Sequence, residues 1–105
     1  MKDIPPLARM LQVIAVGTRV RIIHLLKGRA LCVGALSARL GITQGAVSQH
    51  LRILREAGLV VPEKRGHYVH YRLNNKALRQ WRGAIDRLLE PQVTRRCSCS
   101  GKRQR

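Results

Sequence analysis

The sequence predicts one mostly α-helical domain with a single β-hairpin before its last helix. Three observations support this fold class. A chain of 105 residues has room for one domain. Apolar residues make up 45% of it, but with no Phe and one Trp the core must consist mainly of Leu, Ile, Val and Ala, which favours helices. Apolar residues recur at helical spacing along most of the chain and alternate like a strand only around Gly66, so the expected order is α-α-α-α-β-β-α.

The first third of the chain contains two helical patterns. Apolar residues on one helix face predict a helix over residues 4–15, with Gly17 as its end. Thr18–Lys27 predicts a second helix, closed by Gly28 as a carboxyl-terminal stop. The apolar face expected for this second helix consists of Val20, Ile23, Leu25 and Leu26.

Two further helices are expected close together, over Val33–Leu40 and Gln44–Ala57. Gly41 follows the first, where a helix takes a left-handed cap, and Thr43 has the side chain of an N-cap residue for the second. Two helices joined by about four residues that include a glycine form a helix-turn-helix. The stripe expected to be buried on the second helix consists of Val47, Leu51 and Leu54.

A β-hairpin is expected next, with strands over Leu59–Arg65 and His67–Leu73 on either side of Gly66. Pro62 indicates that the first strand lies at an edge. The second strand should point Val69, Tyr71 and Leu73 inward and Tyr68, His70 and Arg72 outward.

The last helix is expected to begin at Asn74 or Asn75 and to run to about Leu89, before Pro91. We expect residues 1–90 to form one domain and residues 91–105 to form a flexible basic tail that contains Cys97 and Cys99.

The net charge indicates the kind of partner. Lys and Arg number 21 against 5 Asp and Glu, which gives +16, and this charge attracts polyanions such as nucleic acid. No segment approaches the roughly 20 apolar residues of a membrane span, and the start lacks the apolar run of a signal peptide, so a cytoplasmic protein without membrane association is expected. The sequence has no nucleophile with its base and no pair of catalytic acids, so we expect no enzymatic activity and no required cofactor.

The helix-turn-helix and the hairpin together predict a winged-helix DNA-binding domain. Ser48, Gln49 and Arg52 lie opposite the buried stripe, where they can reach base edges and phosphates in the major groove. The hairpin tip can press on a flanking phosphate or on the minor groove. His50 lies at the edge of the stripe and is either a DNA contact or a hydrogen-bonded packing residue. The residues expected to contact DNA are Thr43, Gln44, Ser48, Gln49, His50, Arg52, Lys64, Arg65 and His67.

Residues 41–73 resemble the ArsR/SmtB family of winged-helix repressors. The family motif S-x-H-L-x-x-L-x-x-A-G-L-V appears from Ser48 to Val60, and a wing of the family's type follows as Arg65-Gly66 with Val69, Tyr71 and Leu73. The resemblance runs from about Leu7 to Leu89. It implies a homodimer held by the first and last helices, which represses transcription by binding an operator and leaves the operator when an inducer binds.

The two outermost helices independently favour a homodimer. Each carries a narrow apolar stripe, and a small monomer would struggle to cover both. The alternative is that both stripes pack on the core of their own chain. A two-fold dimer would read a pseudo-palindromic operator of double-stranded DNA. The residues expected at the interface are Leu7, Leu11, Ile14, Leu78, Trp81, Ile85 and Leu88.

The two effector sites common in the family are incomplete in this sequence. The arsenic-sensing members carry E-L-C-V-C-D-L where this chain reads A-L-C-V-G-A-L, so Cys32 matches the first cysteine and Gly34 replaces the second. The other site uses Asp, His and Glu between the last helices of the dimer, and this last helix offers only Asp86 and Glu90. We therefore expect neither site to be intact.

Cys97 and Cys99 in the tail indicate a different effector site. With Cys32 they supply three sulfurs, the number that trivalent arsenic prefers, and a soft divalent metal is the other candidate effector. A repressor that responds to thiol oxidation or to persulfides is one alternative, and inert cysteines are another. The alternative of a different class is a non-sensing architectural protein that binds nucleic acid through charge alone.

Overall fold

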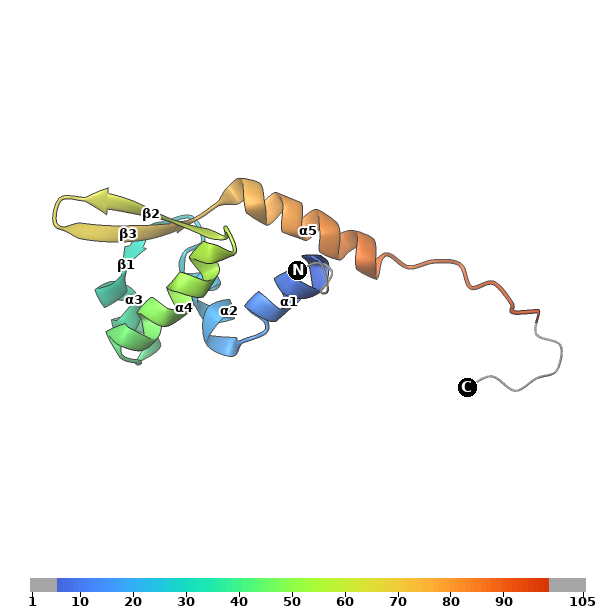
Figure 1. Ribbon diagram of the computed structural model, residues 1–105, viewed down its shortest axis with the longest axis horizontal. Helices are drawn as coiled ribbons and strands as arrows, with labels where there is room; N and C mark the ends of the chain where they lie inside the picture. Colours follow the sequence, from blue (N-terminus) through green and yellow to red (C-terminus); the bar gives the residue numbers. More distant parts are fainter. Residues whose placement is uncertain (1–5, 99–105) are drawn as a thin grey trace.

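The computed structural model describes residues 6–98 and confirms the predicted fold class, a winged helix-turn-helix (Figure 1). In chain order its elements are α1 (Pro6–Ile14), α2 (Gly17–Leu25), β1 (Leu31–Cys32), α3 (Val33–Leu40), α4 (Gln44–Glu56), β2 (Val60–Arg65), β3 (Tyr68–Leu73) and α5 (Asn75–Leu89). Residues 4 and 5 of the first predicted helix lie outside the described residues. Figure 1 shows the β2–β3 hairpin extending from one end of the helical body, whereas α5 runs toward the opposite end beside α1.

The core confirms the stripe predicted for α4 and three of the four residues predicted for the apolar face of α2, since Leu26 is buried and Ile23 and Leu25 pack against the core. In α2 the buried residue is Ile22, whereas Val20 is 40% exposed. Ile22 lies four residues before the buried Leu26, so these two side chains stack on one side of the helix, and Val20 lies on the other side. The buried apolar residues are Ile22, Leu26, Leu36, Leu40, Val47, Leu51, Leu54, Leu59, Val60 and Leu73.

The expected end of the first helix is also wrong. The helix α1 ends at Ile14, and Gly17 begins α2 instead of ending α1. Val16, with an extended backbone, is the N-cap residue of α2. Glycine lowers helix propensity less at such a first position than in a helix interior, so Gly17 does not act as a stop here.

The sheet has three antiparallel strands in the order β1-β3-β2, so it contains one strand that the sequence did not predict. Pro62 lies on the edge strand β2, as expected. The unpredicted strand β1 pairs Cys32 with His70. This pairing corrects the prediction that His70 points to solvent, because His70 is half-buried and its Nδ1 atom is fully buried. Val69, expected inward, is 39% exposed because it lies near the hairpin tip, beyond the end of β1.

Candidate nucleic-acid interface

The exposed face of α4 is polar and basic, as the sequence predicted. Ser48, Gln49 and Arg52 are all exposed, on the side opposite the buried Val47 and Leu51. Arg52 forms an exposed ion pair with Glu56, in which Nε and Oε2 are 3.4 Å apart. Such an exposed pair is weak, so the guanidinium can exchange this partner for a phosphate.

The start of α4 is fixed by its N-cap and by the turn before it. The Thr43 hydroxyl accepts a hydrogen bond from the Ala46 backbone N–H at 3.1 Å, so Thr43 has a structural role in addition to any contact with DNA. Across the turn, the Ser37 hydroxyl donates to the Ile42 carbonyl, with 2.5 Å between the oxygens. Gly41 has φ +69°, the left-handed conformation that favours glycine. These contacts hold α4 at a fixed angle to α3 and leave Gln44 exposed at the first helical position.

His50 lies on the side of α4 that faces α2. Its Nδ1 accepts a hydrogen bond from Arg19 Nε at 3.3 Å, and Arg19 Nη1 also donates to the Val13 carbonyl at 2.8 Å. Burial, and next the positive charge of Arg19, lower the pKa of His50. A neutral, hydrogen-bonded histidine that links α4 to α2 agrees with the packing alternative, and this placement does not favour a DNA contact.

The wing is braced by one acidic residue, Glu63, which is not among the predicted site residues. Glu63 on β2 accepts a hydrogen bond from Arg72 Nε at 2.9 Å and another from Arg65 Nη2 at 3.1 Å. These bonds, from Arg72 first and then Arg65, lower the pKa of Glu63. The carboxylate therefore stays ionised and ties the two strands together along the middle of the hairpin. The available sequence signal was an acidic residue on the first predicted strand, with Arg65 two residues later on the same strand and Arg72 on the facing strand.

The tip of the wing carries the basic residues that were expected to meet DNA. Lys64, Arg65 and His67 are all exposed around Gly66, whose φ of +61° makes the tight turn. Arg65 shares its charge with Glu63, whereas the side chains of Lys64 and His67 form no hydrogen bond or ion pair with other residues of the 6–98 segment. The hairpin therefore presents uncompensated positive charge at its end.

A hollow between α4 and β3 lies beside the exposed face of α4. Ser48, Arg52 and Arg55 of α4 line it together with Tyr71 of β3. Arg55 was not among the predicted DNA contacts, although it lies three residues after Arg52 and is exposed. Two arginines on neighbouring turns of one helix can follow a phosphate backbone.

Cys32 has a structural role at the start of α3. Its Sγ accepts a hydrogen bond from the Ala35 backbone N–H at 3.4 Å, so it is the N-cap residue of that helix. Gly34 lies close by: a Cβ atom there would be 3.9 Å from Cys32 Sγ. His70, directly across the sheet, has an Nδ1 atom without a hydrogen-bond partner among the described residues.

The described structure does not bring the tail to Cys32. Cys97 lies beyond α5, on a segment that runs away from the end of the body where α3 lies (Figure 1), and Cys99 lies outside the described residues. Within residues 6–98 no group of three or more His, Cys, Asp or Glu side chains is placed to hold a metal ion. The site formed by Cys32, Cys97 and Cys99 remains a prediction.

The residues predicted for the dimer interface divide into two groups. Ile14, Leu78 and Trp81 pack against the core of their own chain, which fits the alternative in part. Leu11 is 36% exposed and Leu88 54% exposed, while Leu7 and Ile85 are half-buried. Neither α1 nor α5 contains a fully buried residue.

No helix in the described part of the chain is both long and apolar enough to cross a membrane.

The sequence is similar to known bacterial regulators. Residues 17–61 match the family model described as a bacterial regulatory protein of the arsR family. The chain is 40% identical over 67 residues to the arsenical resistance operon repressor of Escherichia coli K12, a match that covers 63% of this chain and 57% of that repressor. It is 37% identical over 79 residues to the transcriptional activator HlyU of Vibrio cholerae, covering 75% of this chain and 73% of HlyU.

Solved structures agree with this similarity. The crystal structure of a possible transcriptional regulator for arsenical resistance superimposes with a TM-score of 0.69 at 42% identity, covering 74% of this chain and 81% of the other. A homodimeric winged helix-turn-helix DNA-binding domain from Mycobacterium bovis gives a TM-score of 0.66 at 25% identity, covering 87% and 88%. The exposed basic helix, the braced wing and these relatives lead to one conclusion: the chain belongs to the ArsR family of DNA-binding transcriptional regulators.

Proposed function

We propose that the chain is a transcriptional repressor that binds a pseudo-palindromic operator of double-stranded DNA as a homodimer. The observation that carries the proposal is that polar and basic side chains are exposed both on α4, at Ser48, Gln49 and Arg52, and at the wing tip, at Lys64. In the proposed complex α4 enters the major groove, where Gln49 reaches base edges, and the wing contacts the phosphate backbone beside it. Thr43 and Gln44 at the start of α4, and Arg65 and His67 at the wing tip, add further contacts in this complex.

The terminal helices are the proposed dimer interface. A helix pair without any fully buried residue, with Leu11 and Leu88 exposed, leaves an apolar surface that a second copy can cover. The Mycobacterium bovis domain to which the chain is similar is described as homodimeric. Residues 1–90 would then carry both DNA binding and dimerisation, and residues 91–105 would be a basic tail.

Operator selection from a randomised duplex library, followed by footprinting, tests the proposal. The expected result is one short protected site with two-fold related halves, bound at two chains per site. A non-sensing architectural protein would instead select no sequence, and its affinity would fall steeply with salt on every duplex. Protection spread evenly over unrelated sequences would refute the proposed repressor function.

We further propose that a thiol-binding effector, arsenite or another soft metal ion, releases the repressor from DNA through Cys32, Cys97 and Cys99. The Escherichia coli relative is named for arsenical resistance. Cys32 is the N-cap residue of α3, the helix that precedes the turn and the proposed DNA-reading helix α4. A sensor of thiol oxidation or of persulfides, which would use the same cysteines, is the second candidate.

Release of operator DNA by arsenite, cadmium, zinc or polysulfide, measured with otherwise reduced protein, separates these candidates. The double variant Cys97→Ser with Cys99→Ser is expected to stay bound, as is Cys32→Ser. Because a serine hydroxyl can also accept the Ala35 N–H bond, Cys32→Ser keeps the cap of α3 while it removes the thiol. Ser98→Ala is the matched control and should be released normally. If the effector concentration that releases the unsubstituted protein also releases the double variant, the proposed effector site is refuted, but the proposed DNA binding is not.

A further inference from the structure

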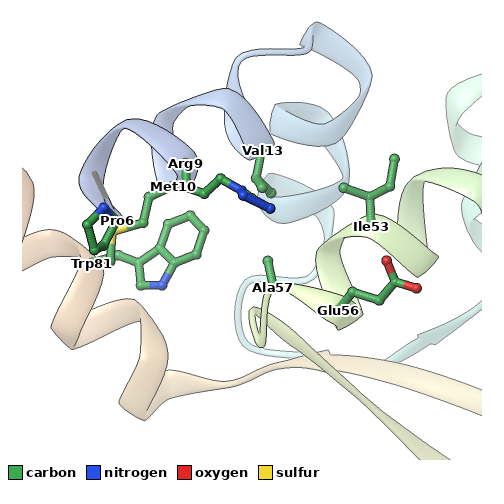
Figure 2. A pocket seen from close by; sticks show the side chains of 8 residues that line it. All are labelled: Pro6, Arg9, Met10, Val13, Ile53, Glu56, Ala57 and Trp81. Carbon is green, nitrogen blue, oxygen red and sulfur yellow. The ribbon is translucent and has the colours of Figure 1, made fainter. Parts of the chain in front are cut away.

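A pocket between α1, the end of α4 and α5 has the composition of a small-molecule site. Its volume is about 440 Å³, within the range of roughly 300 to 1,000 Å³ that is usual for ligand pockets. Figure 2 shows the Trp81 ring and the Met10 side chain on one side, with Ile53 of α4 and Ala57, the residue after α4, on the other. The walls are therefore largely apolar, and one of them is a flat aromatic ring.

One cation points into this pocket. Figure 2 shows the Arg9 side chain leaving α1 and directing its guanidinium into the space above Ala57. Arg9 forms no hydrogen bond or ion pair with any other residue between 6 and 98. Glu56, the acidic residue in the wall, is already paired with Arg52 and points away from Trp81. The pocket thus combines apolar walls with an unneutralised guanidinium.

The structure points to a small aromatic carboxylate as the ligand of this pocket. We propose that the aromatic ring lies against Trp81 and Met10, and that the carboxylate pairs with Arg9. Guanidinium binds carboxylate with two parallel hydrogen bonds, and it does so most effectively where apolar walls exclude water. The proposed ligand differs chemically from the thiol-binding effector, and its site shares no residue with the three cysteines.

A second copy of the chain is the competing occupant, and the geometry of α1 argues against it. At 100° per residue, Leu7 and Leu11 lie roughly a third of a turn away from Met10 and Val13. A partner that covers Leu7 and Leu11 therefore leaves the Met10 and Val13 side facing the pocket. Ile53 lies in the last turn of α4, and Ala57 directly follows that helix. A ligand in the pocket would therefore contact α4 directly.

Calorimetric titration of the full chain with 1-naphthoate, without DNA, tests the site. The expected result is one ligand bound per chain, with binding about tenfold weaker for neutral 1-naphthalenemethanol, since a hydrogen-bonded charge pair is lost. Trp81 is the single tryptophan of the chain, so its indole N–H signal in a nuclear magnetic resonance spectrum should shift on binding. An unchanged indole signal would overturn the proposal.

Two arginine variants locate the ligand. Arg9→Gln is expected to bind 1-naphthoate roughly tenfold more weakly, and Arg9→Lys to keep most of the affinity. Arg82→Gln is the matched control: Arg82 lines a second hollow that also touches Trp81, and its loss should leave the affinity unchanged. If only Arg82→Gln weakens the binding of 1-naphthoate, the ligand lies in the second hollow. If both variants bind 1-naphthoate equally, general attraction to the net charge explains the binding, and either outcome overturns the assignment to Arg9. The titration contains no DNA, so its outcome is independent of the proposed repressor function.

Discussion

Replacing Gln49 with alanine tests whether α4 reads base edges. Gln49 is exposed, and its side chain forms no hydrogen bond with other described residues, so the substitution removes no contact from the folded chain. Alanine also has a helix propensity at least as favourable as that of glutamine. The free energy of unfolding should therefore change by no more than about 0.5 kcal/mol.

The effect on DNA binding should be much larger than the effect on stability. A glutamine that makes two hydrogen bonds to an adenine contributes about 1 to 3 kcal/mol of discrimination, which corresponds to roughly 5- to 150-fold in affinity. Fluorescence anisotropy with the selected operator and with a scrambled duplex measures both affinities. We expect Gln49→Ala to lose this factor on the operator only, with an unchanged dependence on salt because no charge is removed.

Two comparisons make the Gln49 test decisive. Gln80→Ala makes the same chemical change on an exposed position of α5, and it should leave both affinities unchanged. Arg55→Gln removes one positive charge from α4, so it should weaken binding to both duplexes and lower the slope of log affinity against log salt by about 0.9. Equal losses of Gln49→Ala on operator and scrambled duplex would refute the assignment of Gln49 as a base reader.

Three further changes test other parts of the structure. Leu88→Glu places a charge on the exposed end of the α5 stripe and should raise the dimer dissociation constant at least about tenfold in sedimentation equilibrium, whereas Gln80→Glu should not; similar values for both would refute this interface. Gly34→Cys adds a second thiol two residues from Cys32, at a position where a Cβ atom makes only ordinary contacts, so arsenite should bind more tightly by calorimetry, and an unchanged affinity would contradict the expectation. Because the pKa of His50 is lowered in the folded chain, the unfolded chain binds more protons, and stability should fall as the pH drops below the ordinary histidine value of 6.5. His50→Gln should flatten this part of the pH profile in denaturant unfolding, and an equally steep profile would exclude His50 as its source.

The helix-turn-helix could be predicted from sequence because its signals are local and agree with one another. Gly41 marks the left-handed cap, Thr43 marks the next helix start, and the spacing of Val47 and Leu51 fixes which side of α4 is buried. Once that side is fixed, the exposed position of Gln49 follows from helix geometry alone. The face of α2 was harder to predict, because apolar residues occupy several sides of that helix and only packing selects Ile22 over Val20.

The features that the sequence could not predict depend on contacts between distant segments. The strand β1 has only two residues, too few to show an alternating pattern, and it forms because Leu31 pairs with Tyr71. The bond between Arg19 and His50 joins residues 31 positions apart, and neither residue type alone indicates the other as a partner. Both contacts affect the candidate site, since one buries His70 and the other turns His50 toward α2.

Cys32 illustrates why a cysteine shared with a family motif does not by itself establish a sensor. Its sulfur caps α3 through the Ala35 N–H, and its backbone pairs with His70 in the sheet, so the position is constrained even if no effector binds. Cys32 pairs with β3 of the wing and directly precedes α3, the first helix of the helix-turn-helix, so it connects these two parts of the structure. A ligand that draws Cys32 Sγ away from the cap would therefore weaken the start of α3 and disturb its packing with α4, whose orientation DNA binding requires. This coupling needs only the contacts of Cys32 itself, so any thiol-binding effector that reaches Cys32 would act on DNA binding by the same route, whichever other sulfurs complete its site.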